Sequence, residues 1–164
     1  SKMIDESFWK RPAREVAEDL VGRVVSEFIS VGDIPIYGML TEVHAYGEPE
    51  GERGEELFTQ EPGLIGNFSS RRGSIPTITA HEEGGSGLVR LNGLRRGNND
   101  YSTLEISRLL ESGRKSGLHV GQPSGLYIGE TPFDLSTEGL TVVELKINPQ
   151  DPKNLVVKYA LRMV

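Results

Sequence analysis

The sequence has no cysteine among its 164 residues, which excludes disulfides, thiolate metal sites and cysteine nucleophiles. It also has no apolar run near the ~20 residues that a membrane-spanning helix needs. The segment Ser1 to Phe8 carries acidic side chains where a secretion signal needs basic ones followed by an apolar stretch. We therefore expect a protein that is not secreted and does not enter a membrane, and a cytoplasmic location is compatible with this composition.

The length and composition fit one folded domain. Hydrophobic residues make up 36% of the chain and charged residues 26%, as in soluble globular proteins. No proline- or serine-rich linker divides the chain, so we expect a single domain over residues 1–164. The formal net charge of -6, taken over the whole chain, argues against nucleic-acid binding.

The pattern of apolar residues predicts an α+β fold. Helical spacing predicts one helix over Pro12 to Val21, and the capping-box pair Ser102 and Glu105 predicts a second that ends at Gly113. Turn residues between β-prone runs predict two antiparallel hairpins, and three further runs predict strands. The predicted strands are Arg23–Ser30 with Ile36–Tyr46, Ile75–Ala80 with Leu88–Leu94, and then Leu126–Ile128, Thr141–Ile147 and Leu155–Val164. Strands in hairpin order predict a mostly antiparallel, curved β-sheet with short peripheral helices.

Strand Gly38 to Tyr46 is the most informative segment, because alternate side chains of a strand point to opposite faces. One predicted face holds Met39, Thr41, Val43 and Ala45, and the other holds Leu40, Glu42, His44 and Tyr46. The first face is typical of a core. The second brings a carboxylate, an imidazole and a phenol together about 6 to 7 Å apart, which suits a water, a proton acceptor and a flat ligand. The alternative is that these three side chains form the solvated outer face of a hairpin.

Four segments resemble, in order, the methylpurine (alkyladenine) DNA glycosylase family. Phe8-Trp9-Lys10-Arg11-Pro12-Ala13 and the residues to Arg23 resemble its opening helix. Gly38-Met39-Leu40-Thr41-Glu42-Val43-His44-Ala45-Tyr46-Gly47 is similar to the strand with its catalytic glutamate and base-stacking tyrosine. Leu57-Phe58 with Pro62-Gly63, followed by Gly73, resembles the approach to its intercalating hairpin, and Leu88-Val89-Arg90-Leu91 resembles the strand of an active-site arginine. The match covers Phe8 to Gly97 and, faintly, the helix near Leu109 to Val120.

This resemblance implies a divergent enzyme that flips an alkylated or deaminated purine out of double-stranded DNA and hydrolyses its glycosidic bond in base excision repair. It implies His44 in place of the catalytic glutamate, with Glu42 beside it, as catalytic residues. Tyr46 and Arg90 would bind the base or nucleotide, and so would Thr79, which stands where the family has an asparagine. The residues implied at the DNA gap or on phosphate are Arg71, Arg72 and Phe68. It implies no cofactor, a monomer, and a cytoplasmic (nucleoid-associated) or nuclear location.

Two other functions remain open at this point. Because His44 replaces a carboxylate, the chain could keep the fold as a non-hydrolytic damaged-DNA-binding or structural protein, and Arg90 could be a surface arginine. A domain that acts on a small molecule and never meets DNA is the other alternative. The three histidines, His44, His81 and His119, are too scattered for a metal-ligand spacing, so we expect no metal site.

The charge is unevenly distributed along the chain. Residues 41–62 hold seven acidic residues against Arg53 alone, whereas residues 68–116 hold eight basic residues against five acidic ones. The second segment contains Arg71, Arg90 and Arg96, so it could contact backbone phosphates. The acidic segment follows the proposed catalytic strand and should repel phosphate. We therefore expect weak and strongly salt-sensitive DNA binding.

Overall fold

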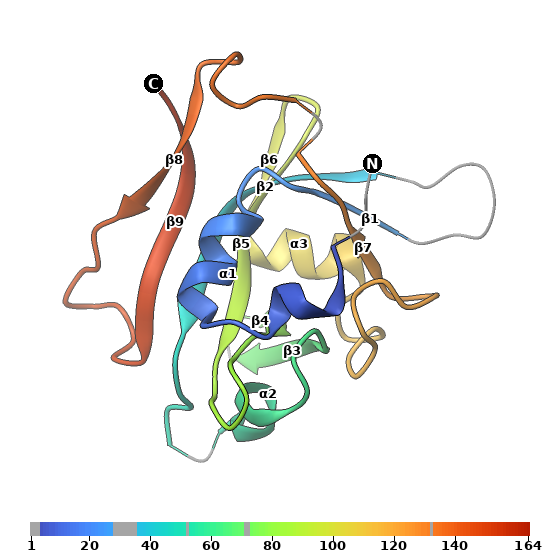
Figure 1. Ribbon diagram of the computed structural model, residues 1–164, viewed down its shortest axis with the longest axis vertical. Helices are drawn as coiled ribbons and strands as arrows, with labels where there is room; N and C mark the ends of the chain where they lie inside the picture. The colour runs from blue at the N-terminus through green and yellow to red at the C-terminus, as the bar shows by residue number, and fades with distance from the viewer. Residues whose placement is uncertain (1–3, 28–35, 52, 71–72, 132) are drawn as a thin grey trace.

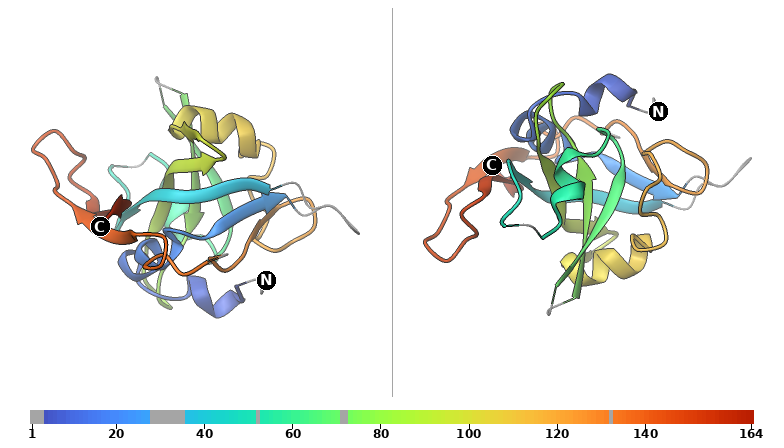
Figure 2. Two further views of the ribbon diagram at one scale, coloured as in Figure 1. Left: turned by 90° about the horizontal axis from the view of Figure 1, so that it is seen from above. Right: turned by 90° about the horizontal axis from the view of Figure 1, so that it is seen from below.

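A curved antiparallel β-sheet forms the centre of the molecule (Figure 1). The computed structural model describes residues 4–27, 36–51, 53–70, 73–131 and 133–164. Within these ranges the sheet has nine strands in the order β3-β4-β5-β2-β1-β7, with β6 beside β5 and β9 beside β2 and β8. Both views in Figure 2 place β8 and β9 at one margin of the molecule. β1 pairs with the first part of β2, and β9 pairs with its second part. The architecture confirms the predicted α+β class with a mostly antiparallel sheet.

The strands and helices have the following bounds. The strands are β1 (Val24–Glu27), β2 (Ile36–Tyr46), β3 (Ile65–Ser70), β4 (Gly73–Thr79), β5 (Leu88–Arg96), β6 (Asn99–Tyr101), β7 (Leu126–Ile128), β8 (Leu140–Leu145) and β9 (Leu155–Met163). The helices are η1, a 3-10 helix (Glu6–Trp9), α1 (Ala13–Leu20), α2 (Glu55–Thr59) and α3 (Thr103–Leu110).

Both predicted strand pairings are present, since β1 pairs with β2 and β4 pairs with β5, in each case antiparallel. The predicted turn residues between β1 and β2 lie outside the described residues. β3, β6 and α2 were not predicted from the sequence. β3 is short and rich in serine, glycine and asparagine, so it has no β-prone signature of its own. It is extended because it pairs with β4 from Ile65↔Ile78 to Ser70↔Gly73.

The two longer helices follow their local sequence. In α1 the buried residues Ala13, Val16, Ala17 and Leu20 have helical spacing, and the helix packs on β2, β5 and β9. In α3 the predicted capping box is present: Glu105 accepts a hydrogen bond from the Ser102 backbone N–H at 3.1 Å. The helix ends at Leu110, three residues before the predicted Gly113.

The alternation of β2 holds over its C-terminal half and fails before it. Val43 and Ala45 are fully buried in the main core, as predicted. Leu40 is also fully buried in that core, so its predicted place beside Glu42 is wrong. The cause is an irregular register, in which Leu40 pairs with Leu94 but Glu42 pairs with Gly93. Such an irregularity moves the side chains before it to the other face of the sheet.

Candidate functional site

A row of polar residues crosses four neighbouring strands on the face of the sheet opposite the main core. Thr77 of β4 pairs with Arg90 of β5, and Arg90 pairs with His44 of β2. His44 in turn pairs with Lys158 of β9. Directly paired residues of antiparallel strands have their side chains close together on one face. The sheet therefore places His44 between an arginine and a lysine that are distant in the sequence.

Glu42 and His44 form a hydrogen-bonded pair. His44 Nε2 lies 2.6 Å from Glu42 Oε2, and the two side chains are 13% and 31% exposed. The hydrogen bond from His44 lowers the pKa of Glu42 and outweighs the opposing effect of burial. An ionised carboxylate only accepts hydrogen bonds, so in the neutral imidazole the proton sits on Nε2 and Nδ1 keeps its lone pair. The pair can therefore serve as a general base.

A second charged pair lies next to it. Lys158 Nζ lies 2.7 Å from Asp151 Oδ2, and the side chains are 11% and 23% exposed. The hydrogen bond from Lys158 is the main cause of a lowered pKa at Asp151, followed by the hydrogen bond from the Asn148 backbone N–H. This pair was not predicted from the sequence, because no local pattern brings Asp151 and Lys158 together.

Arg90 packs against two aromatic rings. Its Cζ atom lies 4.0 Å from the ring centroid of Tyr46 and 4.8 Å from that of Phe68. Tyr46 is only 4% exposed, and burial is the main cause of the raised pKa of its hydroxyl, partly offset by Arg90. Arg90 Nε is buried without a hydrogen-bond partner among the described residues. An orphaned buried donor is energetically unfavourable.

A cavity of about 370 Å³ borders this cluster. It has aromatic and cationic walls as well as one acidic residue, and its lining residues are Glu50, Arg53, Phe58, Phe68, Arg90, Pro152 and Asn154. The guanidinium of Arg53 lies 5.3 Å from the Phe68 ring and donates to the Ser69 carbonyl at 2.7 Å. Flat rings beside guanidinium groups suit a planar ligand that carries an anionic group.

Five of the predicted site residues meet in this region, but they do not all line the cavity. Arg90 and Phe68 line it. Tyr46 and His44 lie beside Arg90, and Glu42 is hydrogen-bonded to His44, but these three are not among the lining residues. Phe68, expected as a wedge into DNA, packs here against Arg90.

The remaining predicted residues lie elsewhere. Thr79 is fully buried, donates to the Leu57 carbonyl at 2.6 Å and accepts from Gln60 Nε2 at 2.8 Å. Its hydroxyl thus joins α2 and the residue after it to β4, and its base-sensing role stays a prediction. Arg71 and Arg72 lie outside the described residues.

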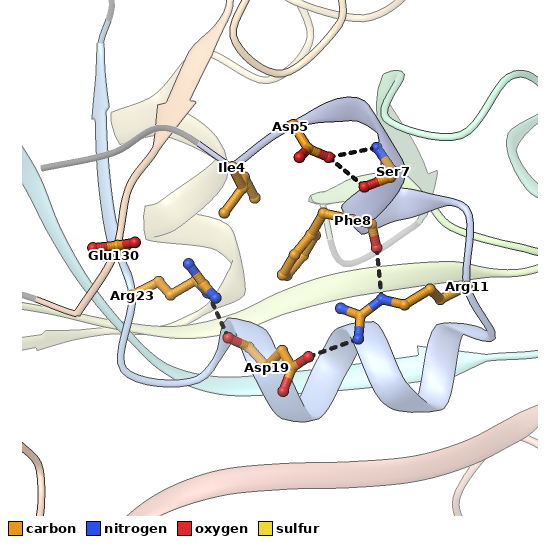
Figure 3. Close-up of a pocket in the computed structure, with 8 residues that line it drawn as sticks. All are labelled: Ile4, Asp5, Ser7, Phe8, Arg11, Asp19, Arg23 and Glu130. Atoms are coloured by element: carbon orange, nitrogen blue, oxygen red, sulfur yellow. Dashed lines mark hydrogen bonds and ion pairs between the residues drawn. The ribbon is translucent and has the colours of Figure 1, made fainter.

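A second cavity, of about 400 Å³, lies where η1 meets α1 (Figure 3). The guanidinium carbons of Arg11 and Arg23 lie 4.8 and 5.0 Å from the Phe8 ring. Asp19 accepts hydrogen bonds from both, through its carboxylate from Arg11 and through its backbone carbonyl from Arg23. Arg23 nonetheless keeps one buried nitrogen, Nη1, without a hydrogen-bond partner among the described residues. We place the candidate site at Glu42 and His44 instead, because no imidazole is among the residues that line this second cavity.

Comparisons with known proteins add no further assignment: no family model matches the chain, and no curated protein matches it. Among the described residues, no helix is both long and apolar enough to cross a membrane. In the same ranges, no three histidine, aspartate or glutamate side chains gather as metal ligands.

Proposed function

We propose that this protein is a divergent DNA glycosylase that flips an alkylated or deaminated purine from double-stranded DNA and hydrolyses its glycosidic bond. The observation that carries the proposal is the Glu42–His44 hydrogen bond of 2.6 Å beside a cavity with aromatic and arginine walls. The resemblance of four segments to methylpurine DNA glycosylases supports the same function. We expect the protein to bind DNA as a monomer, because one enzyme molecule acts at one lesion.

Glu42 and His44 divide the work of a general base in this proposal. His44 Nδ1 takes a proton from water, and the water oxygen forms a bond to the sugar carbon C1′. The bond from C1′ to the base nitrogen breaks, and the base leaves with the electron pair. Glu42 holds the imidazole in the required tautomer through Nε2–H and places a negative charge near the oxocarbenium-like sugar.

Arg90 controls how a flipped base reaches this pair. Its guanidinium covers the Tyr46 ring at 4.0 Å, so a base stacks on Tyr46 only after Arg90 has moved aside. Moving aside frees the buried Nε of Arg90 to find an acceptor, such as a phosphate oxygen of the flipped nucleotide. The same arginine therefore moves off the Tyr46 ring and binds the DNA backbone.

Base release from defined duplexes tests the proposal. Duplexes with ethenoadenine, hypoxanthine or methylated adenine are incubated with the protein, and abasic sites are scored by alkaline strand cleavage. We expect release from at least one lesion, reduced roughly 10²- to 10⁴-fold by His44→Gln. Glu42→Gln removes the charge that orients His44 and should also slow release. His119→Gln is the matched control, because His119 pairs with Glu61 outside this cavity and should retain full activity. Retention of damaged DNA without release from any lesion would overturn the proposal.

A non-hydrolytic damaged-DNA-binding protein is the second candidate function. Two observations favour it: His44 does not line the cavity, and Arg90 covers the Tyr46 ring. In this case the cavity holds a base without bringing water to C1′. Preferential retention of damaged over undamaged duplex, unchanged by His44→Gln and without base release, identifies this function.

A further inference from the structure

Arg53 and Arg90 share one aromatic ring in the wall of the cavity beside the Glu42–His44 pair. Both line that cavity, and their guanidinium carbons lie 5.3 and 4.8 Å from the Phe68 ring centroid. Because both distances end at the same centroid, the two positive charges are at most about 10 Å apart, which is near the screening length in dilute salt. The two charges therefore repel each other in the protein without a ligand.

The backbone before α2 holds Arg53 over this ring. Gly54, the residue before α2, has a φ of 70°, in the left-handed region that favours glycine. A Cβ atom on Gly54 would lie 3.2 Å from Phe68 Cε2, so the lack of a side chain lets this segment approach the ring. Arg53 Nη2 donates to the Ser69 carbonyl at 2.7 Å, near the end of β3. A neutral acceptor thus positions Arg53 and leaves its charge uncompensated.

Within the described ranges, no carboxylate forms an ion pair with Arg53 or Arg90. Arg11 in the second cavity, by contrast, lies 2.8 Å from Asp19. Glu50 lines the same cavity as Arg53, but it is exposed, and water screens an exposed charge. The two guanidinium groups therefore suit an anionic ligand that lies between them.

We infer that Arg53 and Arg90 together form a phosphate-binding site, in which a nucleotide is held by its phosphate group. Guanidinium groups form charge-assisted and often bidentate hydrogen bonds to phosphate oxygens. The cavity volume of about 370 Å³ is in the range of small-molecule sites, and Phe58 and Phe68 supply aromatic surface for a flat base. That this nucleotide belongs to damaged DNA rests on the proposed glycosylase function. The phosphate site itself does not, because it needs no base release.

Binding of free nucleotides tests the site. Deoxyadenosine 5′-monophosphate (dAMP), or deoxyadenosine, which lacks the phosphate, is titrated into the whole protein, and NMR gives both dissociation constants. We expect dAMP to bind roughly 10- to 100-fold more tightly, as charge-assisted hydrogen bonds predict. Arg53→Met should lose most of this preference. Arg114→Met is the matched control and should keep it, because Arg114 is an exposed arginine that pairs with Glu111 and does not line the cavity. Glu50→Gln removes the opposing charge and should tighten dAMP binding.

The outcomes separate this site from the proposed function. Equal affinities for dAMP and deoxyadenosine, or no binding of either, overturn the inference whatever the base release. An unchanged preference in folded Arg53→Met overturns it as well. If the preference depends on Arg53 but no lesion is released, the phosphate site is supported and the glycosylase proposal is overturned.

A damaged duplex shows whether the phosphate is that of DNA. Mobility-shift titrations compare the parent with Arg53→Met at several salt concentrations. A slope of log affinity against log salt that falls by about one unit in Arg53→Met supports a backbone phosphate at this site. An unchanged slope together with Arg53-dependent dAMP binding supports the site and identifies a free nucleotide as its ligand.

Discussion

The guanidinium of Arg90 lies over the ring of Tyr46 at 4.0 Å, so the side chain expected to bind a nucleotide covers the ring expected to stack on the base. Tyr46 is 4% exposed in this arrangement. The two residues therefore cannot act on a flipped nucleotide at once without a movement of Arg90. This relationship makes Arg90 the first residue to substitute.

Replacing Arg90 with methionine should weaken DNA binding and its dependence on salt. The variant keeps an unbranched apolar chain against Tyr46 and Phe68 but loses the cation. If Arg90 contacts a phosphate, the slope of log affinity against log salt falls by about one unit, because one fewer counterion is released. Mobility-shift titrations between low and moderate salt measure the slope. An identical slope in parent and Arg90→Met would show that Arg90 does not reach the backbone.

Acid should remove a stabilising contribution of Glu42. Its pKa is lower in the folded protein than its ordinary value of 4.5, chiefly because of the hydrogen bond from His44. A lowered folded pKa stabilises the protein above the unfolded pKa, and this stabilisation is lost as pH falls through the folded value. We expect the parent to have a higher free energy of unfolding in urea than Glu42→Gln at pH 7, and this difference to shrink below about pH 4.5. A difference that grows as the pH falls from 7 to 3 would contradict the prediction.

Gly93 should be needed for the position of Glu42. A Cβ atom on Gly93 would lie 2.6 Å from Thr41 Oγ1 and 3.0 Å from Glu42 Cβ, so Gly93→Ala pushes on the strand that carries the pair. We expect base release to fall about tenfold, since small displacements of a general base are costly. Gly113→Ala is the control, because the nearest atom to its Cβ is Asn67 Nδ2 at 3.9 Å. Equal release by both variants would argue against a tightly positioned Glu42.

Thr79→Val should distinguish a structural threonine from a base-sensing one. The substitution keeps the shape but removes the hydroxyl that donates to the Leu57 carbonyl and accepts from Gln60. Loss of these bonds should lower the free energy of unfolding by about 1 to 2 kcal/mol, as measured in urea. Lesion preference should be unchanged if the hydroxyl only joins α2 to β4. A changed preference at unchanged stability would instead support the sensing role.

The sequence predicted the features that depend on neighbours along the chain. The spacing of Ala13, Val16 and Leu20 indicated α1, and Ser102 with Glu105 indicated the start of α3. The predictions failed where pairing between strands overrides the local sequence pattern. Leu40 enters the core because the register shifts near Glu42, and β3 is a strand because it lies beside β4.

β9 shows the same limit. Val157, Tyr159 and Leu161 alternate along the strand and are buried, but Lys158 and Ala160 on the other face are buried too. Alternation says which residues share a face, and it does not say what lies over that face. Here β9 pairs with β2, and Asp151 in the segment before β9 pairs with Lys158.

By itself the sequence determined that Glu42, His44 and Tyr46 share one face of one strand, because a two-residue period follows from backbone geometry alone. Only the tertiary structure decided what they meet there. It paired His44 with Arg90 and Lys158, placed Arg90 over Tyr46, and paired Lys158 with Asp151. These partners lie 46 to 114 positions away from His44 in the sequence. Cross-strand pairing joins such residues, and that pairing depends on register and burial across the whole sheet.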